Sequence, residues 1–199
     1  MRWLARGLFA AGAAALGWCL FVIGEGLAYR ELEGRRFDAE RQQNQSDDVF
    51  AASNRTARTA VAPKRHPVDL SGVFGRVDIA RLGLSVMVGE GVDSPALRRS
   101  AGHIPGTGFP GGTGNIGISA HRDTYFRRLK DVRIGDVVAL STVLATYRYR
   151  VVSTTIVEPS NIEVLDPNGG EVLTLITCYP FYFIGEAPNR FVVRAERIH

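Results

Sequence analysis

Cysteine is scarce in this chain, with two residues among 199, Cys19 and Cys178. Cys19 lies inside an apolar N-terminal segment, so the rest of the chain has a single thiol and no partner for a disulfide. If that part is exported to an oxidising compartment, its unpaired thiol calls for a chemical explanation. The alternative is a small buried hydrophobic residue, and the cysteine count alone leaves both interpretations open.

The chain also lacks a basic stripe, although its formal net charge is +4. Its arginines include isolated pairs such as Arg35-Arg36, Arg98-Arg99 and Arg127-Arg128, without interleaved aromatic residues. A nucleic-acid partner is therefore not expected, and the mild positive excess fits a solvated surface. Internal repeats are absent as well, so the sequence does not suggest a repeat architecture.

No cluster of residues has convincing metal-ligand spacing. The acidic residues closest to such a cluster are spread around a loop-like segment, where solvation is a simpler interpretation than calcium binding. We therefore expect neither a metal nor a cofactor. These acidic residues are Glu158, Glu163, Asp166 and Glu171.

The N-terminal segment is apolar and follows Arg2 and Arg6. Its uncharged run, Gly7–Gly24, is close to the minimum length of a membrane span, and Arg6 can extend it by snorkelling. The small residues Ala13–Ala15 could resemble a signal-peptide cleavage site, but strongly apolar residues continue well past them. We predict an uncleaved, single-pass membrane anchor over residues 1–29, with a cytoplasmic N-terminus and an extracytoplasmic remainder.

Residues 30–67 are predicted to form a helical stalk and a flexible linker. The stalk is polar and compatible with a helix to about Asp48, and Ser46–Pro67 has linker composition. From Val68 onward, short β-branched runs alternate with turn residues, which predicts an all-β domain over residues 68–199, either a sandwich or a closed barrel. The runs are Val77–Ile79, Leu82–Val88, Asn115–Ala120, Asp136–Leu140, Thr146–Val157, Leu173–Cys178 and Arg190–Ala195.

One short helix is well signalled within this domain. It covers Ser94–Arg99, with Ser94 as the expected N-cap and Pro95 at the first helical position.

Cys178 ends a β-branched strand, and Pro180 then stops regular pairing. A strand end beside a loop is a place where reactive groups can meet a substrate. Taken alone, this segment favours a buried structural cysteine. His121, however, follows the predicted strand Asn115–Ala120 in the same way, and a thiol and an imidazole at strand ends form a nucleophile and acid/base combination.

A guanidinium near such a pair could stabilise an oxyanion and keep the thiol ionised. Arg190 and Arg194 are both candidates, and a strand places them on the same face because they are four residues apart. An ordinary solvated cation is the alternative for each. Spacing alone does not choose between the two arginines.

The order of these residues is more specific than any one of them. Residues 174–178 read Thr-Leu-Ile-Thr-Cys, with His-Arg-Asp-Thr upstream at 121–124 and an arginine downstream at 190. Over residues 68–199 this pattern resembles the sortase family, whose nucleophile motif is Thr-Leu-X-Thr-Cys. The Cys-Tyr-Pro continuation and the short chain look most like class D. Further matching stretches are Ala101–Thr107, Asn115–Thr124, Arg133–Asp136 and Asn189–Ala195.

This resemblance implies a closed eight-stranded barrel with its cleft at the strand ends. It assigns Cys178 as the nucleophile, His121 as the proton donor and acceptor, and Arg190 rather than Arg194 as the stabiliser of the oxyanion or substrate. One departure is Ser119-Ala120 before His121, where relatives often have glycine. Secondary expectations are cleft-wall positions for Thr124 and Thr177, and a structural role or a minor cleft contact for His103.

The resemblance implies that the protein is a membrane-anchored cysteine transpeptidase. A Leu-Pro-X-Thr-Gly-like sorting signal at the C-terminus of a secreted protein would be cleaved through a thioacyl intermediate. Its acyl group would pass to an amine of a peptidoglycan precursor or a pilin lysine. Two alternatives stay open: a hydrolytic cysteine peptidase, in which Asp123 could orient His121, and a non-catalytic anchored barrel that binds a partner. An L,D-transpeptidase is disfavoured because a Ser-His-Gly-Cys type of motif is missing around Cys178.

Overall fold

The computed structural model describes residues 2–53, 72–167, 169–182 and 185–199. Its elements are α1 (Arg2–Ser53), β1 (Val73–Ile79), η2 (Ala80–Leu82), β2 (Leu84–Glu90), α2 (Ser94–Arg99), β3 (Ala101–His103), β4 (Gly114–Ser119), η3 (Arg127–Asp131), β5 (Val137–Thr142), β6 (Thr146–Val157), η4 (Glu163–Leu165), β7 (Glu171–Tyr179) and β8 (Asn189–Ile198).

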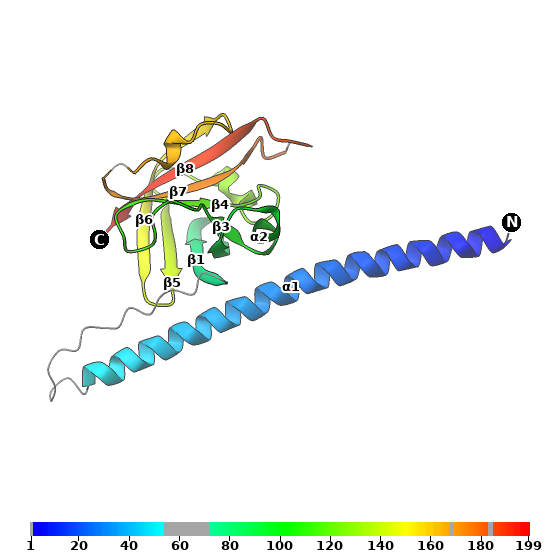
Figure 1. Cartoon of the computed structure of the whole chain (residues 1–199), viewed down its shortest axis with the longest axis horizontal. Coiled ribbons are helices and arrows are strands. Elements are labelled where there is room, and N and C mark those ends of the chain that lie inside the picture. Colours follow the sequence, from blue (N-terminus) through cyan, green and yellow to red (C-terminus); the bar gives the residue numbers. More distant parts are fainter. Residues whose placement is uncertain (1, 54–71, 168, 183–184) are drawn as a thin grey trace.

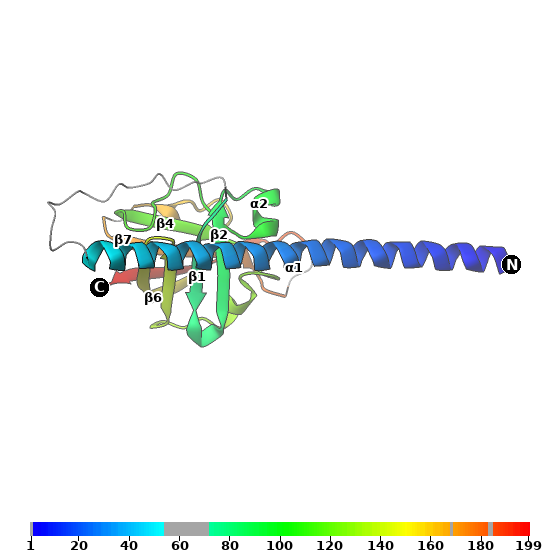
Figure 2. The same cartoon turned by 90° about the horizontal axis from the view of Figure 1, so that it is seen from below.

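The eight strands close into a barrel in the order β1-β2-β3-β4-β7-β8-β6-β5, and α1 runs alongside it (Figures 1 and 2). The β2–β3 and β4–β7 pairs are parallel, and the other pairs are antiparallel. The prediction of a closed eight-stranded barrel is confirmed.

Aliphatic side chains fill the barrel because they alternate with outward-facing residues along the strands. Val77 and Ile79 of β1, Leu140 of β5 and Leu175 of β7 are each 0% exposed. Burying one such side chain contributes roughly 1.5–3 kcal/mol. Burial of these side chains from several strands therefore explains how the barrel holds together.

The three-residue strand β3 was not predicted from the sequence. Ala101–His103 lacks a β-branched run, and it becomes a strand by pairing with both β2 and β4. A Cβ atom on Gly102 would lie 2.0 Å from the carbonyl oxygen of Gly91, so glycine is needed for this close approach. Tertiary pairing, rather than local β-propensity, makes this strand.

The cap of α2 differs from the prediction. Asp93, not Ser94, is the N-cap, because its carboxylate accepts a hydrogen bond from the amide of Ala96 at 2.9 Å. Ser94 is the first residue of the helix itself, and Pro95 lies in its first turn as expected. Both Asp and Ser are strong N-cap residues, so composition alone did not identify the position.

Part of α1 packs against the barrel. Phe37 is 3% exposed, and the guanidinium carbon of Arg76 on β1 lies 5.6 Å from its ring centroid. Arg76 also forms an ion pair with Asp38 at 2.9 Å. Further along the helix, Arg41 Nη2 donates to Thr146 Oγ1 at 2.6 Å. The middle of the predicted stalk is therefore docked on the domain.

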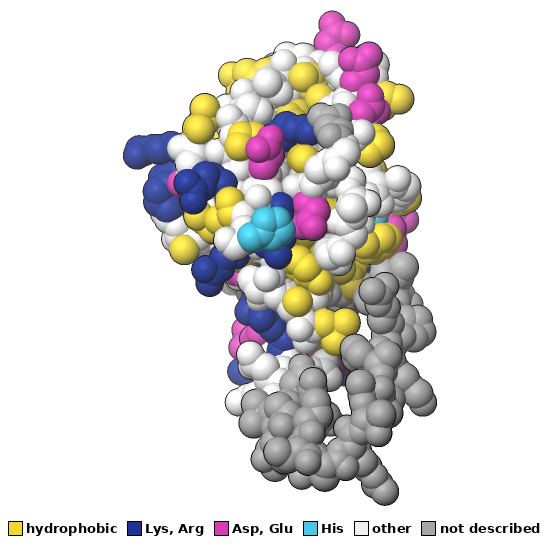
Figure 3. Space-filling model, turned by 90° about the vertical axis from the view of Figure 1, so that its left-hand side faces the viewer, with side chains coloured by type: hydrophobic (Ala, Val, Ile, Leu, Met, Phe, Trp, Pro, Cys, Tyr) yellow, Lys and Arg dark blue, Asp and Glu magenta, His cyan; other side chains and the backbone are white. Residues whose placement is uncertain are grey.

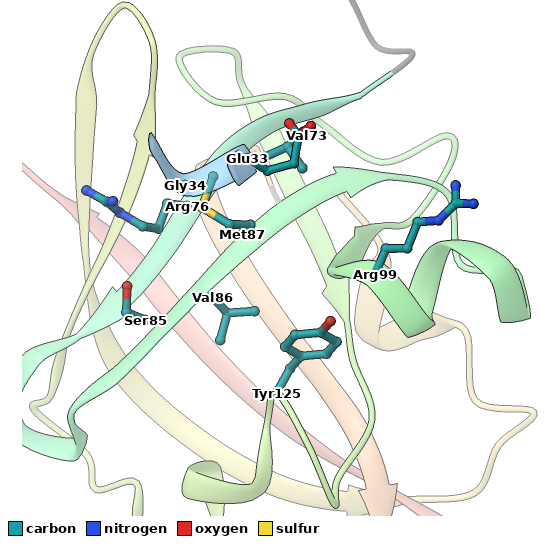
Figure 4. A pocket seen from close by; sticks show the side chains of 9 residues that line it. All are labelled: Glu33, Gly34, Val73, Arg76, Ser85, Val86, Met87, Arg99 and Tyr125. Atoms are coloured by element: carbon teal, nitrogen blue, oxygen red, sulfur yellow. The ribbon is translucent and has the colours of Figure 1, made fainter. Parts of the chain in front are cut away.

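A cavity of about 260 Å³ lies between α1, α2 and the barrel. In Figure 4, Glu33 and Gly34 of α1 lie over β1 and β2, with Arg99 of α2 and Tyr125 at the other side of the cavity. Tyr125 also donates its hydroxyl to the carbonyl of Arg98 at 3.0 Å. The stalk, α2 and the segment after β4 thus meet on one flank of the barrel.

The helix α1 extends to Ser53, past the expected end of the stalk near Asp48. The remainder of the predicted linker, residues 54–67, lies outside the described residues. In the described part of the chain, no helix combines the length and hydropathy needed to cross a membrane.

Figure 3 shows the barrel from the left-hand side of Figure 1. Lysine and arginine side chains lie there in separate groups among acidic and apolar ones. Charge of both signs is interspersed on this face, as expected for a solvated surface.

Candidate active site

Cys178 and Arg190 lie directly opposite each other on neighbouring antiparallel strands. They are Cα partners in the second-to-last pair of the β7–β8 ladder. Arg194 is opposite Thr174 instead, four residues further along β8 and about 13 Å away at the rise of a strand. The geometry therefore separates two arginines that the sequence spacing did not distinguish.

His121 reaches the same end of the barrel from β4. Ser119 pairs with Ile176 in the parallel β4–β7 ladder, and the amide of Ala120 donates to the carbonyl of Ile176 at 3.2 Å. Extending this register by two residues brings His121 alongside Cys178. Both strands stop here, so their terminal side chains are presented at the barrel end.

These three side chains share one pocket of about 550 Å³. His121 is exposed, whereas Cys178, a free thiol, and Arg190 are half-buried. The walls come from the segment after β4, the β6–β7 connection and the β7–β8 connection. The lining residues are His121, Arg122, Asp123, Pro159, Cys178, Gly185, Glu186, Ala187 and Arg190.

The β7–β8 hairpin is stiffened beside the site by three aromatic rings. The Phe181 and Phe191 centroids are 5.3 Å apart, and Tyr179 lies 6.1 Å from Phe181 and 6.4 Å from Phe191. Such aromatic pairs contribute about 0.5–1.5 kcal/mol each beyond their burial. Within this hairpin, Arg190 Nη1 donates to the carbonyls of Ala187 at 3.2 Å and Asn189 at 3.1 Å.

Thr177 lies next to Cys178 but faces the other way. It is 1% exposed, and its hydroxyl donates to the carbonyl of Ala120 at 2.7 Å. Neighbouring strand residues point to opposite faces, so Thr177 points into the barrel while Cys178 faces the pocket. The expectation that Thr177 and Thr124 form the cleft wall is wrong, since neither residue lines the pocket.

Asn115 is a structural residue of the site that the sequence analysis missed. It is 2% exposed, accepts from the Thr174 hydroxyl at 2.7 Å and donates to the carbonyl of Val164 at 3.0 Å. These bonds join β4, β7 and the β6–β7 connection, whose Pro159 lines the pocket. The available signal was an asparagine and a threonine within otherwise apolar strands.

His103 lies in the barrel wall and not in the pocket. It is 0% exposed, with Nδ1 2.8 Å from Glu90 and Nε2 2.9 Å from the carbonyl of Gly108. Thr107 Oγ1 is 3.0 Å from the same Nε2. These contacts tie the β3–β4 connection to β2, which fits the structural role expected for this histidine.

No carboxylate orients His121 in the described part of the chain. Asp123 lines the same pocket, but no hydrogen bond or ion pair joins it to His121 there. The described residues also contain no group of three or more His, Cys, Asp or Glu residues that could hold a metal ion. Of the acidic residues considered for calcium, Glu171 forms an ion pair with Arg197 at 3.0 Å.

The fold and the site together define a closed β-barrel with a thiol-containing pocket at its strand ends. The family model of the sortase domain matches residues 77–198, which is more than half of the chain. The chain belongs to the sortase family.

Three relatives illustrate the match. Sortase D of Bacillus subtilis (strain 168) is 32% identical over 125 residues, which cover 62% of this chain and 63% of that protein. A sortase D5 transpeptidase structure from Clostridium perfringens has a TM-score of 0.58 at 26% identity, covering 64% of this chain and 79% of its own. The lid mutant of sortase A from Corynebacterium diphtheriae has a TM-score of 0.60 at 29% identity, covering 69% and 74%.

The matched region thus spans less than two thirds of the length of the Bacillus protein. The resemblance to sortases, with class D members among the matches, is confirmed.

Proposed function

We propose that this protein is a membrane-anchored cysteine transpeptidase that cleaves a sorting signal and transfers the resulting acyl group to an amine. The observation that carries the proposal is the opposition of Cys178 and Arg190 on β7 and β8, with His121 in the same pocket. The family membership and the Thr-Leu-Ile-Thr-Cys sequence at residues 174–178 support it.

In the first half-reaction the Cys178 thiolate attacks the scissile carbonyl carbon and forms a C–S bond. Arg190 donates hydrogen bonds to the resulting oxyanion. The C–N bond then breaks, and the His121 imidazolium gives its proton to the departing amine. The products are a thioester on Cys178 and a free C-terminal fragment.

In the second half-reaction an amine attacks the thioester carbonyl. His121, now neutral, accepts the proton that the amine loses, and the C–S bond breaks to restore the thiolate. The new amide joins the substrate to the acceptor. A Leu-Pro-X-Thr-Gly-like signal on a secreted protein is the proposed donor, and a peptidoglycan precursor or pilin lysine is the proposed acceptor.

The proposed anchor is residues 1–29, in a single pass with the N-terminus in the cytoplasm. Its support is the uncharged run Gly7–Gly24 behind Arg2 and Arg6. Carbonate extraction of the full chain tests it, with a variant lacking residues 1–29 as the control. Release of the full chain into the alkaline supernatant would contradict the anchor and leave the transpeptidase proposal intact.

The decisive test follows thioester formation on the full-length chain. Wild type is incubated with Leu-Pro-X-Thr-Gly peptides, with and without an amine, and its mass is measured. We expect an acyl adduct on Cys178 and a new amide product when the amine is present. Cys178→Ala should lose both, whereas the matched variant Cys19→Ala should retain both. Free carboxylate as the sole product, even at high amine concentration, would favour the hydrolytic alternative.

A further inference from the structure

The β7–β8 connection is held by two guanidinium groups that come from opposite walls of the pocket. Arg122 Nη2 donates to the carbonyl of Gly185 at 3.1 Å. Arg190 Nη1 donates to the carbonyl of Ala187 at 3.2 Å. All four residues line the candidate active site, so these bonds hold the described part of the connection, residues 185–188, against the pocket.

The two arginines differ in their roles in the proposed reaction. In the proposed mechanism Arg190 donates to the oxyanion, although in this structure its Nη1 is bonded to the carbonyls of Ala187 and Asn189. When Arg190 turns toward the substrate, the bond to Ala187 is the one at risk. Arg122 follows the end of β4 and has no role in the proposed mechanism, so it does not have to release Gly185 during the reaction.

Arg122 is well placed to keep its bond throughout the reaction. It directly follows His121, whose backbone is fixed by the β4–β7 pairing and by Thr177 through Ala120. Arg122 is itself half-buried, whereas its hydrogen bond to Gly185 is exposed, so the charge on the donor is what strengthens this bond. A bond from a charged donor to a neutral carbonyl is stronger than a neutral one.

We propose that Arg122 is a positioning residue that holds the β7–β8 connection against the pocket while Arg190 exchanges its loop carbonyl for the substrate. This inference rests on the proposed function. Arg122 shapes the wall against which the sorting signal binds, and it does not take part in proton or acyl transfer. Its loss therefore weakens peptide binding more than it slows the chemical steps.

The test uses the full-length protein and the variants Arg122→Ala and Arg122→Lys. Arg127→Ala is the matched control, because it removes the same charge from an exposed position five residues away. Hydrogen exchange of residues 185–188 is measured first, without substrate. We expect exchange about tenfold faster in Arg122→Ala, as for the loss of one charged hydrogen bond, and unchanged in Arg127→Ala.

Steady-state transpeptidation then separates positioning from chemistry. We expect the KM for the sorting peptide to rise about tenfold in Arg122→Ala while kcat changes less than threefold. Arg122→Lys should give an intermediate KM, because it keeps the charge but has a single donor group in place of the planar fork. Alkylation of Cys178 by iodoacetamide should remain within twofold of wild type in all variants.

Two outcomes would overturn the inference. One is unchanged exchange of residues 185–188 in both Arg122 variants. The other is a fall in kcat at constant KM, which would indicate a role in the chemical steps. If Arg122→Ala does not fold, Arg122→Lys still tests the bond through exchange alone. If exchange is faster in Arg122→Ala than in wild type, but the wild-type protein shows no transpeptidation, the proposed function is contradicted and the loop contact is not.

Discussion

Thr177 donates its hydroxyl to the carbonyl of Ala120 at 2.7 Å, so the residue before the candidate nucleophile holds the residue before the candidate acid/base. The bond is buried and crosses from β7 to the end of β4. It therefore connects the backbones that carry Cys178 and His121 without touching the pocket. The positions of the two candidate groups depend on each other through the barrel interior.

The first prediction concerns this bond. Thr177→Val keeps the side-chain shape but leaves the buried carbonyl of Ala120 without its donor, which should cost about 1–3 kcal/mol of unfolding free energy. We also expect kcat to fall about tenfold. Without this bond the backbone of Ala120, next to His121, is held less firmly, and a small misplacement of a catalytic group slows the reaction. Urea unfolding and peptide turnover measure the two effects. Thr177→Ser should stay close to wild type, and equal losses in both variants would contradict a hydrogen-bonding role.

The two arginines of β8 provide a second prediction. Arg190→Ala should lower kcat about 10²–10³-fold, the usual effect of removing an oxyanion donor. Arg194→Ala is the matched control, because Arg194 lies on the same strand face but opposite Thr174. Its kcat should remain within threefold of wild type. Similar losses in the two variants would show that general charge, and not position opposite Cys178, is what matters.

A third prediction tests the docking of α1. Phe37→Ala removes the buried ring beneath Arg76, so residues 31–46 should exchange amide hydrogens faster while the barrel keeps its own protection. Leu32→Ala is a control on the same helix, since Leu32 is 57% exposed. Hydrogen exchange with mass spectrometry resolves the two regions. Loss of protection throughout β1 and β2 would mean that the helix is part of the domain's cooperative unit.

Tyr149 gives a prediction for alkaline pH. Burial raises the pKa of its phenol to about 12, from an ordinary value near 10. The folded state favours the neutral phenol, whereas the unfolded chain ionises near pH 10. The contribution of Tyr149 to stability is therefore complete below pH 10 and is lost as the pH rises toward 12. Tyr149→Phe should show a flatter decline of unfolding free energy between pH 9 and 11.5, measured with urea. An unchanged slope would contradict the prediction.

Asp136 gives a prediction for acidic pH. Hydrogen bonds from Arg81 at 2.5 and 2.6 Å, and from the amide of Arg133 at 2.8 Å, lower the pKa of this carboxyl against the opposing effect of burial. Its stabilising contribution is present above an ordinary carboxyl pKa of about 3.9 and is lost as the pH falls through the lower folded value. Asp136→Asn should be less stable at pH 7 and approach wild type at the acidic end. Urea unfolding from pH 2 to 7 measures the convergence, and a constant difference would contradict it.

The sequence predicted those barrel strands that contain a run of β-branched or aromatic residues. Thr146–Val157 matches β6 residue for residue, because β-branched and aromatic residues run through it. β3 was missed because three residues with a glycine become a strand only when β2 and β4 are already in place. Asp93 was missed as a cap because two adjacent residues had suitable chemistry.

Within the site, the order of motifs predicted which residues meet, and the structure places Cys178, His121 and Arg190 in one pocket. Their catalytic roles remain predictions. The direction of Thr177 followed from strand alternation once Cys178 faced the pocket, but the register was needed to see that its partner is Ala120. The contact of Arg122 with Gly185 joins residues 63 positions apart, and nothing local signals it.

Because α1 is docked on the barrel, its N-terminal part projects in a fixed direction relative to the pocket. About 30 residues of α1 precede the segment that contacts the barrel, which is about 45 Å of helix at 1.5 Å per residue. They project beyond the same end of the barrel at which the β7–β8 connection lies (Figures 1 and 2). These residues include the proposed anchor, residues 1–29, so the helix fixes which end of the barrel faces the membrane and not how far the pocket reaches from it.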